Sequence, residues 1–324
     1  MNFAKVKSEY QASLERYMRN SLNGYCGEMA GYHFESGGKR LRGIIPLYLF
    51  QVYNRDINEV FPFAAAVEML HNATLVHDDL QDGDDYRRNH QSVWKKYSPE
   101  QAVNCGNYMF QTTTALLLEL RAPSEVVRNV ISRTVNMTLK VIEGQAQEFL
   151  LKQKEMPTER DYLAVAKNKT SGLFSLPILG TFDLLEYQNL DFLSKVTDEL
   201  GVLFQIQDDW LDLYGKKGRA IEGCDIAEGK ISFLVVRFLE RASSEDRALF
   251  LEILRKPREK TTNDDVLLAK NLLVKTGVKE DCEAEMKRRA QKVLEDVRHE
   301  ESRVRALFNE MLLEIMPVEW NSRQ

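Results

Sequence analysis

The chain lacks the features that mark zinc-binding, disulfide-rich and all-β proteins. Its 324 residues include four cysteines, none of them in a C-x-x-C pair, so neither a zinc site nor a disulfide framework is expected. It has only eight prolines, and no Asn-Gly or Asp-Gly turn separates alternating apolar runs. Strands and hairpins are therefore not expected.

Long apolar runs and an excess of positive charge are also missing. The longest uncharged apolar runs, residues 43–54 and 171–182, are too short to span a bilayer. The opening MNFAKVKSEYQ lacks the apolar core of a signal peptide. The net charge of −5 gives no reason to expect nucleic acid as a partner. We expect a cytoplasmic protein without a stable membrane anchor.

What the sequence does contain is nearly continuous helical periodicity. The segment 59–81 is apolar on most sides, which predicts a buried helix. No low-complexity linker interrupts the chain, so we expect one all-α domain over residues 1–324 with an apolar interior. The predicted helices cover residues 3–22, 39–53, 59–81, 99–120, 124–152, 159–170, 172–184, 190–214, 230–242, 245–255, 263–276 and 279–315.

An acidic D-D-x-x-D motif, Asp78, Asp79 and Asp82, ends the apolar helix 59–81. On a helix, residues i and i+4 share a face, so Asp78 and Asp82 are expected to point the same way. Carboxylates this close repel one another, and a divalent cation would offset the repulsion. Mg²⁺ binds through one or two carboxylates together with substrate phosphates. Because acidic helix faces are usually just solvated, this motif alone is weak evidence.

A second D-D-x-x-D motif, Asp208, Asp209 and Asp212, ends another apolar helix. Exposed acid is disfavoured at a helix C-terminus, where the macrodipole is negative. Stability alone does not explain why acidic residues stand at this unfavourable end of two separate helices. The pair of motifs therefore favours metal binding.

Basic residues are concentrated in four further segments, at 35–43, 87–88, 167–172 and 218–230. The first precedes a helix N-terminus, which favours anions, and the last is glycine-rich and could close over a site. Each could also be an ordinary solvated turn or helix junction. His71 lies on the face of Asp78, whereas we expect His33 at the surface.

The motifs GGKRLR, LHNATLVHDDLQD with Arg-Arg after it, KT, FQIQDDWLD and GCDIAEGK resemble, in this order, those of the trans-isoprenyl diphosphate synthases. The resemblance covers nearly the whole chain. The two-residue spacer of the first motif is similar to that of geranylgeranyl diphosphate synthases. The resemblance implies an isoprenoid-synthase-type helical bundle with a central apolar shaft, assembled as a homodimer.

The implied activity is a Mg²⁺-dependent head-to-tail condensation of isopentenyl diphosphate with an allylic diphosphate. Three Mg²⁺ ions would be held directly by Asp78, Asp82 and Asp208, and directly or through water by Asp79, Asp209 and Asp212. Thr170 and Gln205 would offer oxygen dipoles to the allylic cation. The implied diphosphate ligands are Arg87, Lys169 and Lys230 for the allylic substrate and Lys39, Arg42, His71 and Arg88 for isopentenyl diphosphate.

Some positions depart from the family pattern. The usual R-R-G-x-P is Arg87-Arg88-Asn89-His90-Gln91, without the glycine and the proline. Arg219 takes the place of a lysine in the glycine-rich segment, with shifted spacing, and would be a further phosphate contact. Glu148 stands where the family usually has an aspartate. These changes leave room for an unusual substrate or product.

Product length should follow from the depth of the apolar shaft. Each isoprene unit extends about 4–5 Å, so it uses roughly one turn of a helix that rises about 1.5 Å per residue. Ala73 and Thr74, one turn before Asp78, are small, whereas farnesyl enzymes often have an aromatic residue there. Tyr108, Met109 and Phe110 could close the shaft further down. We therefore expect a C20 product, geranylgeranyl diphosphate.

Four alternatives remain open at this point. The chain could be a synthase of another chain length, or it could catalyse a head-to-middle or other non-standard prenyl coupling. A class I terpene cyclase shares one D-D-x-x-D motif, but it normally replaces the second by an N-S-E-type triad. A non-catalytic regulatory subunit tends to lose aspartates, and all six are present here.

Overall fold

The structure is a computed structural model that describes residues 2–215 and 223–316. Contacts divide the chain into two compact units, Met1–Thr138 with Leu173–Lys195, and Leu139–Gly172 with Val196–Gln324. Nearly every element is a helix, so the all-α prediction is confirmed. The single domain over residues 1–324 stays a prediction. In the described part of the chain, no helix is both long and apolar enough to cross a membrane.

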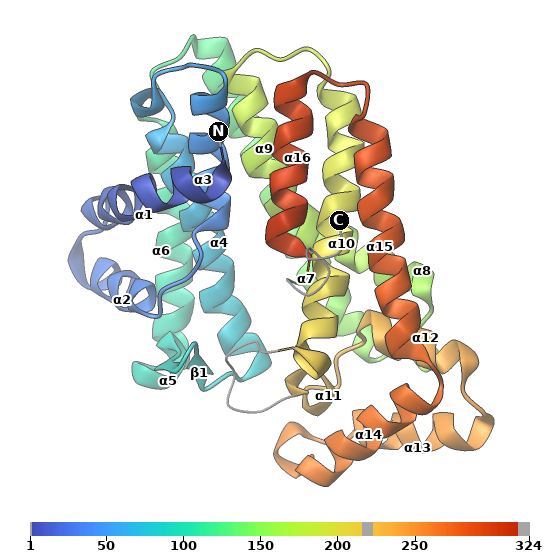
Figure 1. Ribbon diagram of the computed structural model, residues 1–324. Coiled ribbons are helices and arrows are strands. Elements are labelled where there is room, and N and C mark those ends of the chain that lie inside the picture. Colours follow the sequence, from blue (N-terminus) through green and yellow to red (C-terminus); the bar gives the residue numbers. More distant parts are fainter. Residues whose placement is uncertain (1, 216–222, 317–324) are drawn as a thin grey trace. The chain divides into compact units, whose positions relative to one another are not determined.

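The first unit is arranged around α4 (Phe61–Asp82), which packs against α1, α3 and α6 (Figure 1). Residues 62–70 of α4 are all buried, as expected for a helix that is apolar on most sides. Phe63 approaches Gly180 so closely that a Cβ there would lie 2.3 Å from its ring. The described elements of this unit are α1 (Phe3–Asn20), α2 (Gly24–Glu35), α3 (Leu41–Val52), η1 (Ile57–Glu59), α4, β1 (Tyr86–Arg87), β2 (His90–Gln91), α5 (Val93–Lys96), α6 (Pro99–Leu117), the first half of α7 (Ser124–Lys152) and most of α9 (Gly172–Leu184).

The second unit contains α10, which carries the second acidic motif, and the C-terminal hairpin of α15 and α16. These two helices lie side by side in Figure 1 and contact each other. The described elements are the end of α7, α8 (Glu159–Ala166), the π-helical turn η2 (Lys167–Ser171), most of α10 (Leu190–Tyr214), α11 (Cys224–Ala227), α12 (Phe233–Arg241), α13 (Ser244–Leu254), η3 (Arg258–Lys260), α14 (Asn263–Lys275), α15 (Val278–Val297) and α16 (Ser302–Ile315).

One predicted helix is wrong, and one observed helix was not predicted. The helix predicted over 279–315 is broken after Val297, because the stretch RHEESR that follows offers no apolar side chain to hold a buried face. The break lets α16 fold back on α15. Helix α2 was not predicted, because three glycines lower the helix propensity of its sequence GYCGEMAGYHFE. It is held by buried Met29, Ala30 and Phe34.

A short β-hairpin, also not expected, follows the first acidic motif. Tyr86 pairs with Gln91 and Arg87 with His90, so the turn consists of Arg88 and Asn89. Both turn residues have positive φ, 50° and 66°. This is the pattern of a type I′ turn, in which Asn is one of the residues that tolerate the left-handed conformation.

Candidate active site

The first acidic motif forms the last turn of α4, which ends at Gly83 with φ 69°. Asp78 and Asp82 are half-buried, whereas Asp79 is only 1% exposed. The difference follows from the helix, since adjacent residues point about 100° apart while residues four apart nearly coincide. Two carboxylates on one partly accessible face fit the donor set that Mg²⁺ takes from a protein.

The buried carboxylate of Asp79 is bound by Arg87 of the hairpin. Arg87 Nε donates to both carboxylate oxygens, at 2.7 and 2.9 Å, and Arg87 Nη2 donates to Oδ1. Burial disfavours the charge of Arg87, but Asp79 outweighs this effect, so the pKa of Arg87 is raised. The ion pair fixes the hairpin to the end of α4.

A group of cationic and imidazole side chains lies one to two turns before the aspartates. Arg42 is buried on α3, and its Nη1 lies 3.1 Å from His71 Nε2. Burial lowers the pKa of His71, and Arg42, Arg88 and Arg87 lower it further. The imidazole is therefore neutral, and Nε2 accepts a hydrogen bond from Arg42. Its buried Nδ1 has no hydrogen-bond partner among the described residues.

Arg88 joins the hairpin to the glycine pair that precedes α3. Its Nη1 donates to the Gly37 carbonyl oxygen. A Cβ at Gly38 would lie 2.4 Å from this nitrogen, so the guanidinium covers the glycine backbone. Burial lowers the pKa of Arg88, and the neighbouring charges of Arg87 and Arg40 add to the effect. Lys39, which follows Gly38 in the sequence, is exposed. The crowded cations would be relieved by a bound polyanion.

A buried polar network, which was not predicted from the sequence, supports these cations. Arg40 Nε donates to Glu15 at 3.0 Å, and its Nη1 lies 3.9 Å from Glu68. Glu68 accepts from Gly43 N at 3.0 Å, at the start of α3. Asn72 Nδ2 donates to the Glu68 carbonyl at 2.8 Å, and Asn72 Oδ1 lies 3.2 Å from His33 Nε2. Polar residues four apart in an otherwise apolar helix were the available signal.

His33 is therefore not the surface residue that the sequence suggested. It is 4% exposed, and the pKa of its imidazole is lowered to about 3, first by burial and then by Arg87. Burial in the neutral form fits a hydrogen bond donated by Nε2 to Asn72, because the amide nitrogen of Asn72 already donates to Glu68. The error arose because α2 was not predicted, so no buried face was assigned to this histidine.

The second acidic motif, on α10, presents its three aspartates differently. Asp208 is half-buried, Asp209 is 1% exposed and Asp212 is 4% exposed. Asp212 Oδ2 accepts from Asp225 N at 3.0 Å and so fixes the turn that leads to Lys230. Lys230 Nζ lies 3.3 Å from Asp225 and 3.5 Å from Asp209. These carboxylates raise the pKa of Lys230 although burial opposes its charge.

Lys169 and Thr170 lie in the π-helical turn η2 between α8 and α9. Such wide turns within helices occur frequently at functional sites. Lys169 Nζ pairs with Glu148 at 2.6 Å, and Thr170 Oγ1 donates to Gln205 Oε1 at 2.6 Å. Burial opposes the charge of Glu148, but Lys169 and Lys230 outweigh it and lower its pKa. The glutamate thus serves as the partner of Lys169.

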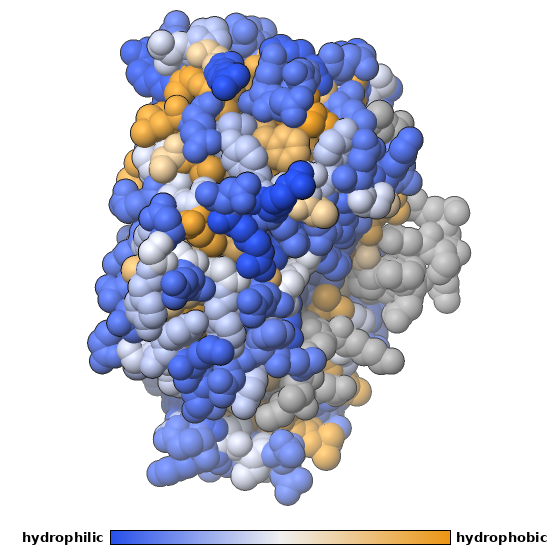
Figure 2. Space-filling view, turned by 90° about the vertical axis from the view of Figure 1, so that its left-hand side faces the viewer, coloured by the Kyte–Doolittle hydropathy of each residue, from blue (hydrophilic) through white to orange (hydrophobic). Residues whose placement is uncertain are grey.

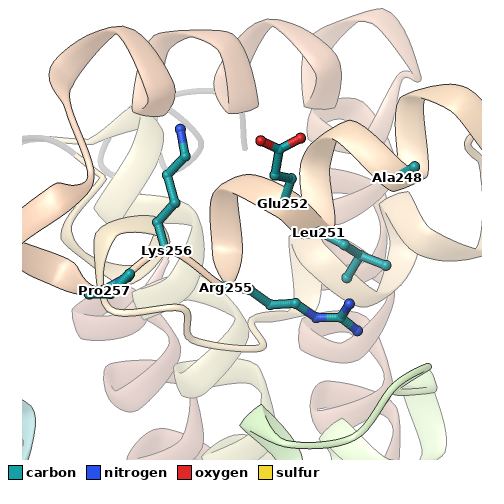
Figure 3. Close-up of a pocket in the computed structure, with 6 residues that line it drawn as sticks. All are labelled: Ala248, Leu251, Glu252, Arg255, Lys256 and Pro257. Atoms are coloured by element: carbon teal, nitrogen blue, oxygen red, sulfur yellow. The ribbon is translucent and has the colours of Figure 1, made fainter.

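The described residues of the second unit line hollows of two kinds. One, of about 10 Å³, is lined by Glu148, Tyr162, Lys169, Gln205 and Lys230 among others, and it lies within the group of residues just described. The other is open, about 600 Å³, and lies at the end of α13 (Figure 3). There Glu252 and Lys256 point to one side of the helix and Arg255 to the other. Lys256 pairs with Asp265 at 2.6 Å, and no predicted site residue lines this hollow.

The residues proposed to set product length lie on α4 and α6, which pack together. Ala73 is fully buried, and Thr74 Oγ1 donates to the His71 carbonyl at 2.8 Å. Tyr108, Met109 and Phe110 point in different directions because they are consecutive on a helix. The Tyr108 hydroxyl accepts from Asn23 N at 2.9 Å, Met109 is fully buried, and the Phe110 ring lies 5.6 Å from the His77 ring of α4.

Metal binding and one phosphate contact stay predictions. No group of three or more His, Cys, Asp or Glu side chains arranged to hold a metal occurs within residues 2–215 and 223–316. Arg219 lies outside the described residues. Asp78 and Asp82 in the first unit, and Asp208 in the second, are each half-buried, so each is accessible enough to bind a metal together with a phosphate ligand.

The chain is similar to known prenyl synthases both in sequence and in fold. The sequence profile of the polyprenyl synthetase family matches residues 23–272. A geranylgeranyl diphosphate synthase of Saccharolobus solfataricus is 33% identical over 239 residues, 70% of each chain. Geranylgeranyl pyrophosphate synthetase from Pyrococcus horikoshii has a similar structure, with a TM-score of 0.86 at 26% identity over 97% of this chain and 98% of that one. A polyprenyl synthase from Caulobacter crescentus, complexed with calcium and isoprenyl diphosphate, shares the fold, with a TM-score of 0.84 at 20% identity over 95% and 94% of the chains.

Proposed function

The chain belongs to the polyprenyl synthetase family and is a prenyltransferase, and from this premise we propose that it joins isopentenyl diphosphate to an allylic diphosphate. One observation carries the proposal. Within a single unit, partly accessible Asp78 and Asp82 end the same helix on which neutral His71 contacts Arg42, with Arg88 nearby. This combination of acid for a metal and cations for phosphate suits a metal-bound diphosphate together with a second diphosphate.

The proposed roles follow the sequence analysis. Asp78, Asp82 and Asp208 would hold up to three Mg²⁺ ions, which would neutralise the departing diphosphate. Lys169 and Lys230 would hold the allylic diphosphate. Arg42, Arg88, Lys39 and the Nδ1–H of His71 would hold isopentenyl diphosphate. Arg87 is bound to Asp79, and a phosphate contact would have to share it.

In the proposed reaction, the allylic C–O bond breaks and the diphosphate leaves with the bonding electrons. The double bond of isopentenyl diphosphate attacks the resulting allylic cation and forms the new C–C bond. This leaves the positive charge on the other carbon of the former double bond. The diphosphate that has left then takes a proton from the carbon next to it, which restores a double bond. The oxygens of Thr170 and Gln205 would stabilise the positive charge, an electrostatic task that a preorganised site performs well.

We further propose a C20 product. Its support is the absence of a bulky residue at Ala73 and Thr74, the burial of both, and the names of the relatives from S. solfataricus and P. horikoshii. The family fixes the reaction class without fixing product length. Of Tyr108, Met109 and Phe110, we propose Phe110 as the residue that limits it, because the Phe110 ring lies 5.6 Å from the His77 ring of α4.

The proposal is tested by product analysis of the purified protein. With Mg²⁺, isopentenyl diphosphate and dimethylallyl, geranyl or farnesyl diphosphate in turn, we expect a single all-trans C20 diphosphate. Conversion of an allylic diphosphate alone to hydrocarbon or alcohol would favour a terpene cyclase instead. Failure to turn over any mixture, with the metal present, would favour a regulatory subunit. A branched product would indicate non-standard coupling.

We also propose that the protein is a homodimer formed through α7. Val135, Leu139, Ile142 and Leu150 are 51%, 59%, 53% and 65% exposed. With exposed Ala146, they form one stripe along the helix. The stripe is about 22 Å long, because Leu150 lies 15 residues after Val135 and each step along a helix adds about 1.5 Å. A second copy can cover it by a two-fold contact of the stripe with itself.

The surface near α1 and α2 has no such continuous apolar stripe in the view of Figure 2. Figure 2 shows the side on which α1 and α2 lie in Figure 1, where hydrophilic side chains predominate and hydrophobic ones form small separate patches. Surface hydrophobic residues scattered in this way are ordinary.

Among the described residues the four cysteines form no disulfide, which fits the cytoplasm that we propose as the compartment.

A further inference from the structure

The second acidic motif is bound from within the protein by a tyrosine to which neither the motifs nor the proposed reaction gives a role. Tyr162 lies on α8 and is 3% exposed. Its hydroxyl donates to Asp209 Oδ2 at 2.8 Å. Its ring packs against Phe233 of α12, with the ring centres 5.7 Å apart. The phenol is therefore held on both sides, and its one polar atom is directed at the middle aspartate of the motif.

Asp209 is surrounded by donors. Oδ2 also accepts from Phe233 N at 2.9 Å, and Oδ1 accepts from Gln205 Nε2 at 2.8 Å. Lys230 Nζ lies 3.5 Å from Oδ1. A carboxylate that is 1% exposed and receives this many donors orders its neighbours, because each of them is fixed in place by its bond to the same two oxygens.

The ordered carboxylate of Asp209 orients the side-chain amide of Gln205. Its amide nitrogen donates to Asp209, and its amide oxygen accepts from Thr170 at 2.6 Å. The reversed amide would bring its oxygen against the carboxylate, so Asp209 determines the orientation. Thr170 then uses its hydroxyl hydrogen on Gln205 and keeps its oxygen lone pairs for a positive charge. Tyr162, Lys169, Gln205 and Lys230 line one small hollow.

We propose that Tyr162 is a positioning residue for the condensation. It holds Asp209 in the orientation that fixes the Gln205 amide, and through it the Thr170 hydroxyl, as well as the Lys230 ammonium. The inference rests on the proposed function for its kinetic consequences, but the chain of hydrogen bonds from Tyr162 to Thr170 can be tested without catalysis.

Tyr162→Phe is the decisive variant, because it keeps the ring that packs on Phe233 and removes the hydroxyl alone. Small displacements of groups that meet the reacting atoms cost up to about 100-fold in rate. We expect kcat to fall roughly 10- to 100-fold, while KM for isopentenyl diphosphate stays within about twofold of the wild-type value. Circular dichroism checks that the variant is folded.

Tyr17→Phe is the matched control. The Tyr17 hydroxyl also donates to a carboxylate, that of Glu119 at 2.7 Å, but it belongs to α1 and to no proposed site. It should leave kcat unchanged. Equal effects of the two variants on kcat would mean that Tyr162 acts only on stability, and would overturn the inference.

A double-mutant cycle and a spectrum without substrate complete the test. In a Thr170→Val background, Tyr162→Phe should lower kcat little further, because both changes act on the same chain. Multiplicative effects would contradict the inference. The side-chain amide signals of Gln205 in ¹⁵N-glutamine-labelled protein, assigned with Gln205→Leu, should shift in Tyr162→Phe and not in Tyr17→Phe. Unshifted signals would refute the inference even if the wild type had no synthase activity, and shifted signals would uphold the chain in that case.

Discussion

At the scale of single residues, burial decides which titratable groups make stability depend on pH. The imidazole of His33 has an ordinary pKa of 6.5, and in the folded protein its pKa is lowered to about 3. Between these values the unfolded chain binds a proton that the folded one does not. The free energy of unfolding must therefore fall as pH drops below 6.5, by roughly 1.4 kcal/mol per pH unit.

The change that isolates this effect is His33→Gln, since glutamine can still donate to Asn72 but does not titrate. The wild type should lose about 2 kcal/mol more free energy of unfolding than the variant between pH 6.5 and pH 5. Urea unfolding at both pH values measures the difference. His71, whose pKa is also lowered, contributes equally to both proteins. Parallel losses in the two proteins would show that His33 is accessible to protons in the folded state.

Single residues should also determine product length. Thr74 is 8% exposed and lies one turn before Asp78, beside fully buried Ala73. A phenylalanine in place of Thr74 should block the predicted shaft about one turn below the aspartates, which corresponds to about one isoprene unit. We expect Thr74→Phe to change the main product from C20 to C15, as read by chromatography of the dephosphorylated products. Thr74→Val, which also removes the hydrogen bond to His71, is the control and should keep C20.

At the scale of elements, the hairpin shows how a turn can lose its usual glycine. Asn89 has φ 66°, a conformation that costs asparagine little and alanine about 1 kcal/mol. Asn89→Ala should therefore lower the free energy of unfolding by about 1 kcal/mol and raise KM for isopentenyl diphosphate, because the turn holds Arg88 against Gly37. Asn89→Gly should leave both unchanged. Chemical unfolding measures the free energy, and steady-state kinetics measures KM. An equal KM for the two variants would mean that the turn does not position Arg88.

Elements also show how far the sequence could predict the structure. Most helices followed from periodicity, because α4 and α10 bury nearly whole faces. The different surroundings of the adjacent aspartates in each motif did not follow from periodicity. Asp79 and Asp209 have the same residue type and spacing, and their partners Arg87 and Tyr162 lie 8 and 47 residues away. A bond over such separations depends on packing, which a local pattern does not encode. The hairpin and α2 were missed for the opposite reason, since their local signals are weak.

At the scale of the whole molecule, the exposed stripe on α7 predicts the state of assembly. Leu139→Glu combined with Ile142→Glu places two charges per chain in the proposed contact. Burying unpaired charges costs several kcal/mol. The dissociation constant Kd of the dimer should therefore rise by roughly 100-fold or more. Light scattering after size-exclusion chromatography should give the mass of one 37.4-kDa chain for the variant and of two for the wild type.

A matched pair of substitutions on another helix separates assembly from a general effect of surface charge. Leu267 and Val274 of α14 are 56% and 51% exposed, close to the values for the α7 pair. Leu267→Glu with Val274→Glu should leave the dimer intact if α7 forms the contact. A dimer that survives the α7 substitutions but not the α14 substitutions would move the interface to α14. If the α7 variant is a folded monomer, its turnover per chain then measures how much the site depends on the second copy.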